Sequence, residues 1–329
     1  MTVIAAPSPA PAPSPAPNRG GRRFSLPDRG YRGILGVVAL LFGALAVWFV
    51  VSLVIQAKPA FSTLGFSWIV GKTWNPTHNQ YGLLPFILGT IESTAIAVVL
   101  AVPIGLGTAI ALAYLVPGRV RPVLSTTVEL LAAVPSVIFG LWGLIVLAPW
   151  FRVTVEPILT AAFGWTGLFD GPDRGVGLLL AGVILAIMIL PTMVAISRDV
   201  LVVVPNEQVE GAMALGATRW QVLRKVVVPG ARTGILGAFT LATGRALGET
   251  VAVAMVIGNS PFIAHSLKSS AATLPSLIVN NFGESTGTEL SALFGAGLVL
   301  LVIGILVNSA ARWLVWSTGA DAAGTELGR

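Results

Sequence analysis

Two opposite charges, Arg245 and Glu249, lie four residues apart inside a long apolar stretch of this 329-residue sequence. If the stretch is helical, residues at i and i+4 share one face, so the two side chains can pair. A charge at the middle of a bilayer costs about 3 kcal/mol on insertion scales, and such residues mark substrate or ion pathways. Two interpretations stay open: an ion pair that lets the helix insert, and a binding site for an anion.

An arginine beside a carboxylate suits one anion in particular. A guanidinium offers forked N–H donors that match a tetrahedral oxyanion. The Glu249 carboxylate would repel a fully deprotonated anion, yet it can accept a hydrogen bond from a P–OH group. Phosphate keeps a proton near neutral pH and sulfate does not. As an anion site, the pair therefore predicts selection of phosphate over sulfate.

Other polar residues lie within or at the edge of apolar stretches. Glu129 is near the predicted cytoplasmic end of the third stretch, and Glu92 is near the outer end of the second. Each lies either in a substrate path or at the membrane interface. Pro135 interrupts helical hydrogen bonding, so backbone groups and the Ser136 hydroxyl can face a cavity. We take Glu129 and Ser136, together with the Arg–Glu pair, as candidate path residues.

Several kinds of function are excluded by what the sequence lacks. It has no Cys, and His78 and His265 lie far apart in predicted loops, so we expect no metal site. Residues 65–73 resemble a phosphate-binding loop, but five residues separate the glycines where the motif needs four. No nucleophile with a matching base is apparent. We expect a transport chain rather than an enzyme, with no cofactor of its own and no nucleic-acid partner.

The composition places most of the chain in lipid. Hydrophobic residues make up 55% of the sequence and charged residues only 10%, too few to cover a soluble surface. Six apolar stretches reach the length of about 20 residues that a helix needs to cross a bilayer. They lack the alternation of barrel strands. We predict an all-α integral membrane fold with spans at about 33–55, 84–113, 128–150, 176–197, 234–258 and 290–311.

The positions of Lys and Arg predict the orientation. With a cytoplasmic N-terminus, fourteen of the twenty lie in cytoplasmic segments, five in outer segments and Arg245 within a span. This excess is typical of the cytoplasmic side, so both termini of this multi-pass protein are expected in the cytoplasm. We expect residues 1–32, Pro/Ala-rich and then basic, to be disordered. Residues 33–315 should form the transmembrane domain, and 316–329 a cytoplasmic tail.

The longest predicted cytoplasmic loop, about 205–230, carries apolar residues at spacings of seven, three and four: Met213, Trp220, Leu223 and Val227. In a single helix these side chains would form one stripe that includes Gly216, and the helix could lie on the membrane surface. Alternatively, Gly216 marks a turn between two short helices.

The same loop resembles the EAA loop of ABC-importer permeases. In that family Glu-Ala-Ala is followed by Gly four residues on and by Pro thirteen residues after the Gly. The positions that match are Glu210, Ala212, Gly216 and Pro229. Gly211 replaces the first Ala of the pattern. The resemblance implies that these five residues couple the membrane domain to an ATPase subunit, whose groove receives the loop.

Three stretches resemble the phosphate-specific (Pst) ABC importer family, in particular its PstC-type permeases: 84–90, 129–142 and 244–259. The last continues Val-Ala after Gly-Glu-Thr, where PstA-type chains tend to continue Ala-Pro. The resemblance implies a type I ABC importer permease fold with six transmembrane helices, and it places Arg245 and Glu249 in the path of inorganic phosphate. It also implies a PstA-type second permease, two PstB-type ATPase subunits that bind ATP–Mg, and an external PstS-type phosphate-binding protein.

Two other functions stay open at this point. One is a permease for another oxyanion, such as sulfate or molybdate. The other is a proton-coupled secondary transporter with Glu249 as its proton site. Inverted sequence repeats would favour the secondary transporter, and none in this sequence is convincing.

Overall fold

The structure, a computed structural model, describes residues 28–324. It divides into two units within helix α1 (Asp28–Leu64): one reaches Val50, and the other comprises everything from Val51 onward. Most of the segment predicted to be disordered, residues 1–27, lies outside the described residues, and residues 28–32 begin α1. The predicted first span, 33–55, is part of this longer helix.

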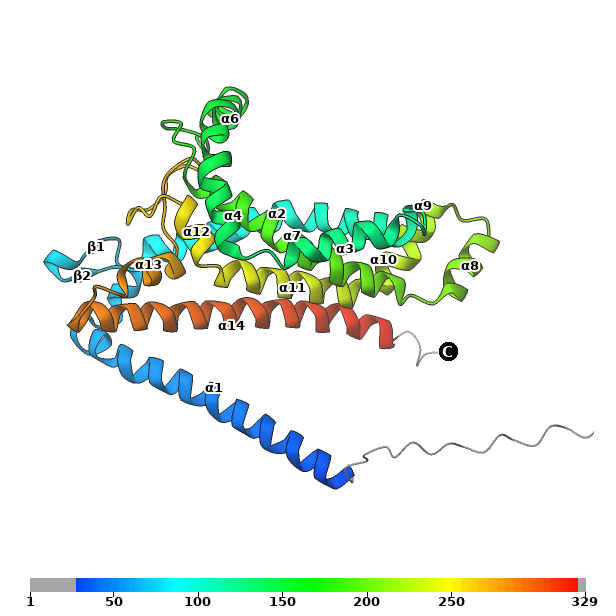
Figure 1. The fold of residues 1–329 in the computed structure, drawn as a ribbon, viewed down its shortest axis with the longest axis horizontal. Helices are drawn as coiled ribbons and strands as arrows, with labels where there is room; N and C mark the ends of the chain where they lie inside the picture. The colour runs from blue at the N-terminus through cyan, green and yellow to red at the C-terminus, as the bar shows by residue number, and fades with distance from the viewer. Residues whose placement is uncertain (1–27, 325–329) are drawn as a thin grey trace, which may run out of the picture. The chain divides into compact units, whose positions relative to one another are not determined.

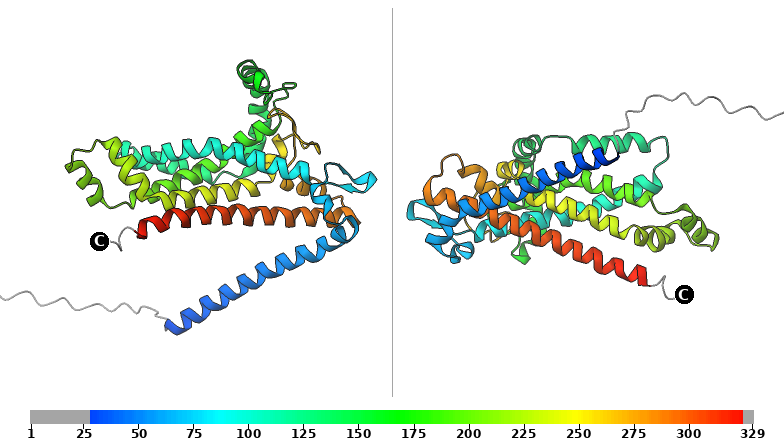
Figure 2. Two further views of the ribbon diagram at one scale, coloured as in Figure 1. Left: turned by 180° about the vertical axis from the view of Figure 1, so that it is seen from behind. Right: turned by 90° about the horizontal axis from the view of Figure 1, so that it is seen from below.

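Four long helices of the second unit lie side by side (Figures 1 and 2): α2 (Leu84–Ile110), α7 (Leu178–Val202), α11 (Arg232–Gly248) and α14 (Gly287–Gly324). α7 is the most buried of the four and packs along α2, which continues through a π-helical turn, η3 (Ala111–Leu115). Glycines let these two backbones approach, since Gly182 faces Ile96 and Gly105 packs on Met193. Such packing through small residues is typical of helices in lipid.

The predicted third span, 128–150, is wrong in its bounds. The chain forms α3 (Arg121–Ala132), breaks at residues 133–135, and resumes as one apolar helix, Ser136–Thr166. Pro135 causes the break, because proline has no N–H to donate and disfavours a helical residue before it. The long helix contains α4 (Ser136–Trp142), η4 (Gly143–Leu147), α5 (Ala148–Trp150), η5 (Phe151–Val155), α6 (Glu156–Phe163) and η6 (Gly164–Thr166). Its far end, α6, stands away from the bundle (Figure 1).

The predicted fifth span, 234–258, is also broken. α11 ends at Gly248, and a short helix, α12 (Val251–Val256), follows after two residues. Before α11, the segment Arg219–Gly230 meets it at a bend of 68°. Five helices of the described chain are long and apolar enough to cross a membrane, or six if the bent pair is one span. The all-α expectation is confirmed.

The two ends of the bundle differ (Figures 1 and 2). At one, here called the hairpin end, strands β1 (Trp74–Asn75) and β2 (Gln80–Tyr81) pair antiparallel. The short helix η2 (Pro76–His78) connects the two strands, and η1 (Ser67–Val70) precedes them in the chain. Helix α13 (Leu274–Asn281) lies there too. At the opposite end, here called the α8 end, four short helices connect α7 to α11: α8 (Asn206–Ala214), α9 (Arg219–Val222), η7 (Leu223–Val227) and α10 (Val228–Gly230). α14 continues to Gly324, so the predicted tail from 316 is helical up to there, and residues 325–329 lie outside the described part.

Candidate functional site

Arg245 and Glu249 lie on opposite sides of the break in the fifth apolar stretch. Arg245 is in the last turn of α11, whereas Glu249 is extended, with φ −70° and ψ 127°. The chain turns away after Glu249, and among residues 31–313 no ion pair joins the two side chains. The predicted i, i+4 pair is wrong. Gly248 favours helix poorly, and the Glu249 carboxylate accepts the backbone N–H of Ala252 instead, at 3.4 Å.

The polar groups at this break are open to their surroundings. The Arg245 side chain is exposed, and within residues 31–313 it makes no hydrogen bond or ion pair. Glu249 and Thr250 are half-buried, and the Thr250 hydroxyl donates to the Gly248 carbonyl oxygen at 3.2 Å. A bare guanidinium on an apolar helix is costly in lipid. The break therefore suits a water-filled cavity or a partner surface better than a lipid-facing one.

The break before Ser136 lies beside the break before α12. Gly140 of α4 packs against α12, where an added Cβ would come within 2.9 Å of the Ala252 Cα and 2.8 Å of the Met255 sulfur. Three residues on, Gly143 lies in the same way against Val256. Residue numbers therefore increase in the same direction along α4 and α12. The two helices run parallel, and their first residues lie at the same end. Ser136, half-buried as the first residue of α4, is thereby brought to the same side as the start of α12.

Glu129 has a defined partner. Its carboxylate lies 3.3 Å from the Arg198 guanidinium of α7, which also binds Asp199 at 2.8 Å. The Glu129 side chain is 55% exposed and that of Arg198 is 19% exposed. This ion pair ties α3 to α7. The Glu129 carboxylate therefore already has a structural partner, and a role in the substrate path would have to be shared with that contact. Glu92 is half-buried on α2.

The predicted coupling loop consists of two short helices with a turn at Gly216 between them, which confirms the second of the two alternatives. Gly216 has φ +82°, its N–H donates to the Met213 carbonyl at 2.9 Å, and the Ala217 N–H donates to the Ala212 carbonyl at 3.1 Å. These two bonds and the left-handed glycine form the Schellman motif that ends a helix. Thr218 then starts the next helix with a capping box, since its hydroxyl accepts the Gln221 N–H at 3.3 Å.

The other alternative for this loop, one helix with a single apolar stripe, is wrong, because the turn at Gly216 separates α8 from α9. Leu223 and Val227 are buried against the ends of α2 and α7. Trp220 is 67% exposed and Leu215 is 91% exposed. A cavity of about 280 Å³ lies where η3 meets the helices of this loop, lined by Tyr114, Leu115, Val209, Met213, Arg219, Val222, Leu223 and Val227. The turn thus presents apolar side chains outward on a base that is packed into the bundle.

The EAA-loop residues lie around this turn. Glu210 and Gly211 are exposed on α8, and Ala212 is half-buried there. A Cβ added at Gly216 would meet no atom within 4 Å, so space does not require glycine there. The left-handed backbone, with φ +82°, does. Pro229 is exposed in α10, next to the bend into α11.

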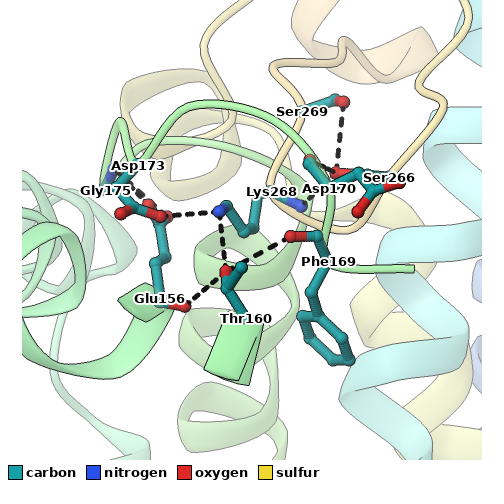
Figure 3. Close-up of polar contacts among 9 residues, drawn as sticks. All are labelled: Glu156, Thr160, Phe169, Asp170, Asp173, Gly175, Ser266, Lys268 and Ser269. Carbon is teal, nitrogen blue, oxygen red and sulfur yellow. Dashed lines mark hydrogen bonds and ion pairs between the residues drawn. The ribbon is translucent and has the colours of Figure 1, made fainter. Parts of the chain in front are cut away.

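A charged cluster that the sequence did not predict lies near the hairpin end (Figure 3). Lys268 and Glu156 are each only 2% exposed, and the Lys268 ammonium lies 2.6 Å from the Asp173 carboxylate. Lys268 follows both Glu156 and Asp173 by more than 90 positions, and no local motif marks the three residues. In the described part of the chain, no group of three or more His, Cys, Asp or Glu residues is placed to hold a metal ion.

Comparison with known proteins identifies close relatives. A family model for the binding-protein-dependent transport system inner membrane component matches residues 101–317. The phosphate transport system permease protein PstC of Mesorhizobium japonicum is 44% identical over 299 residues, covering 89% of this chain and 91% of the relative. The protein of the same name from Pasteurella multocida is 43% identical over 268 residues, covering 80% and 84%. The resemblance to Pst permeases is confirmed.

Solved structures share the fold at lower identity. An inward-facing MetNI methionine ABC transporter chain matches with a TM-score of 0.55 and 20% identity, over 75% of this chain and 99% of that one. A chain of a bacterial ABC transporter involved in alginate import matches with a TM-score of 0.58 and 16% identity, over 88% and 99%. The expected ABC-importer permease fold is confirmed. This multi-pass membrane chain belongs to the family of binding-protein-dependent transport system inner membrane components.

Proposed function

We propose that this chain is a permease subunit of an ATP-driven ABC importer and that it moves inorganic phosphate into the cytoplasm. The observation that carries the proposal is the 44% identity, over nearly the whole of both chains, to a phosphate transport system permease. The chain itself would be non-enzymatic, with ATP–Mg bound and hydrolysed by two PstB-type subunits. A PstA-type permease would complete the membrane domain, and an external PstS-type protein would deliver phosphate.

The α8 end would face the cytoplasm. Lys and Arg are concentrated in the segments that connect spans at this end, which is typical of the cytoplasmic side. The exposed Trp220 and Leu215 would then meet an ATPase subunit, and Glu210 and Gly216 would set the shape of that contact. η7 and α10 link this turn to α11, so closure of the ATPase subunits would act on the helix that carries Arg245.

The phosphate path would pass the paired breaks at residues 133–135 and 249–250. Non-helical backbone is tolerated at membrane depth where it lines a cavity. Arg245 would donate to phosphate oxygens, and Glu249, free of Arg245, would accept from the P–OH group. Ser136 would add a hydroxyl from the neighbouring helix. A second permease would cover the exposed side of Arg245 and close the path.

The function is tested by reconstituting this chain with its permease, ATPase and binding-protein partners in proteoliposomes. Phosphate uptake should require enclosed ATP, should persist when an uncoupler collapses the proton gradient, and should resist excess sulfate or molybdate. Uptake driven by a proton gradient without ATP would identify a secondary transporter instead. Competition by sulfate or molybdate would identify a permease for another oxyanion.

The path residues are tested in the same vesicles, with uptake normalised to assembled complex. Hydrogen bonds to charged groups are worth about 1.5–3 kcal/mol each, so Arg245→Gln should lower phosphate uptake about tenfold or more. Arg245→Lys keeps the charge without the fork and should lose less. Glu249→Gln replaces a pure acceptor by an amide that also donates, so discrimination against sulfate should shrink. Unchanged uptake and selectivity in Arg245→Gln and Glu249→Gln would remove both residues from the path.

The coupling role is tested by Trp220→Ala. Truncating an exposed aromatic anchor of an interface costs about 2 kcal/mol or more, so ATPase subunits should bind about thirtyfold more weakly. Since the side chain is 67% exposed in the isolated chain, the thermal stability of the permease should not change. The matched control is Val203→Ala, which is 79% exposed at the same end but outside the turn. Equal ATPase binding by the two variants would contradict the docking role.

A further inference from the structure

Lys268 joins three segments at the hairpin end. It lies in the loop between α12 and α13, and its ammonium contacts Asp173 at 2.6 Å and the Thr160 hydroxyl at 2.9 Å (Figure 3). Thr160 belongs to the helix Ser136–Thr166, and Asp173 to the segment that follows it. Burying an ammonium to 2% exposure is costly unless it is paired and hydrogen-bonded. The two contacts therefore hold the loop firmly on the other two segments.

Glu156 fixes the segment after the helix from the other side. Both of its carboxylate oxygens accept the Gly175 backbone N–H, each at 3.1 Å (Figure 3). Gly175 has φ +75°, and an added Cβ would overlap the carbonyl oxygen of Ala148, so only glycine fits there. Thr160, which binds Lys268, also donates to the Glu156 carbonyl oxygen at 2.8 Å. The Thr160 hydroxyl thus bonds both to the Lys268 ammonium and to the Glu156 backbone.

Backbone bonds extend this attachment to α12 and α7. The Gly177 N–H donates to the Val256 carbonyl, in the last turn of α12, at 3.0 Å. The first two N–H groups of α7, those of Leu178 and Leu179, donate to carbonyls of the loop that carries Lys268, at 3.1 and 2.8 Å. Such groups at a helix start have no partner within their own helix. The loop after α12 is therefore bonded to the segment before α7 and to α7 itself.

α12 is consequently attached to the helix Ser136–Thr166 in two ways, by direct packing and through the loop that follows it. Along its length, from Ala252 to Val256, it packs directly on Gly140 and Gly143 of that helix. After its end, Lys268 of the following loop donates to Thr160 in the far part of the same helix and pairs with Asp173 in the segment before α7. Glu156 of the helix binds that segment as well, at Gly175. A short helix held by both its own packing and its following loop cannot slide along or tilt away from its neighbour without breaking one attachment.

We propose that Lys268 is a positioning residue of the transport path: it clamps α12 to the helix Ser136–Thr166, so that the two breaks move as one rigid body during transport. The inference rests on the proposed function, because it concerns the path that the breaks would line. Lys268 acts from the hairpin end, through Asp173 and Thr160, without touching the breaks. The rigid body keeps Ser136 and Glu249 in register while α11 and the partner subunits rearrange around it.

The test is a distance measurement that does not depend on the substrate. Because the chain has no Cys, single cysteines at Trp165 and Phe262, which are 86% and 67% exposed, can carry spin labels within the assembled importer. The two labels report on the helix and on the clamped loop. The distance distribution should be narrow and the same in the nucleotide-free and ATP-held states. A shift between these states would overturn the rigid body.

The role of Lys268 itself is tested by Lys268→Met with Asp173→Asn, which leaves neither charge of the ion pair unpaired and so spares the fold. The label distribution should broaden, and phosphate uptake per assembled complex should fall about tenfold. Lys72→Met, at an exposed lysine of the same end, is the matched control and should keep the narrow distribution. A narrow distribution in the Lys268 variant would overturn the assignment. Phosphate uptake by the unaltered importer reports separately on the proposed function.

Discussion

The constraint on which this fold depends is that lipid offers no hydrogen bonds to an open backbone. A helix in the membrane can stop only where its freed N–H and C=O groups find protein or water. This chain stops helices α3 and α11, at residues 133–135 and 249–250, and packs the segments that resume, α4 and α12, against each other. α7 packs against both α4 and α12, and α11 carries Arg245 to the edge of the break.

Glycine placement explains how two breaks can share one location. Gly140 and Gly143 remove the side chains that would otherwise separate α4 from α12. At the α8 end, Gly216 serves a different purpose, since nothing crowds it and its left-handed backbone turns the chain between α8 and α9. One kind of residue thus sets both the closeness of two helices and the direction of the exposed turn that would meet the ATPase.

Hydropathy predicted the fold class and most of the apolar segments, because burial in lipid is read from composition over about 20 residues. It could not predict where a span breaks. Pro135 gave a local signal for one break, whereas Gly-Glu-Thr at 248–250 reads equally well as helix. The Arg245–Glu249 pair was wrong because the helix ends between them, and the Glu249 carboxylate accepts the Ala252 N–H of the next helix instead. The turn at Gly216 was one of two alternatives, and hydrogen bonds that the sequence does not reveal decide between them.

The Lys268 cluster was missed because it depends on tertiary contacts alone. Thr160 and Lys268 are 108 positions apart, and a lysine in a predicted outer loop reads as a solvated charge. In the structure Lys268 is buried, so it is not a solvated charge. A charge that is 2% exposed has to be paired, and its partners then report which segments the fold holds together.

The central claim, that the two breaks line a water-filled phosphate path, is tested most directly by thiol labelling of the assembled importer. Single cysteines replace Ser136, Thr250 or, as a control, Val99, which is 71% exposed on α2 in the apolar span. A charged, membrane-impermeant thiol reagent reacts with the thiolate form that exists in water. The account predicts that positions 136 and 250 react, that phosphate delivered by the binding protein slows both reactions, and that position 99 stays unreactive. Positions 136 and 250 as unreactive as position 99 would contradict it.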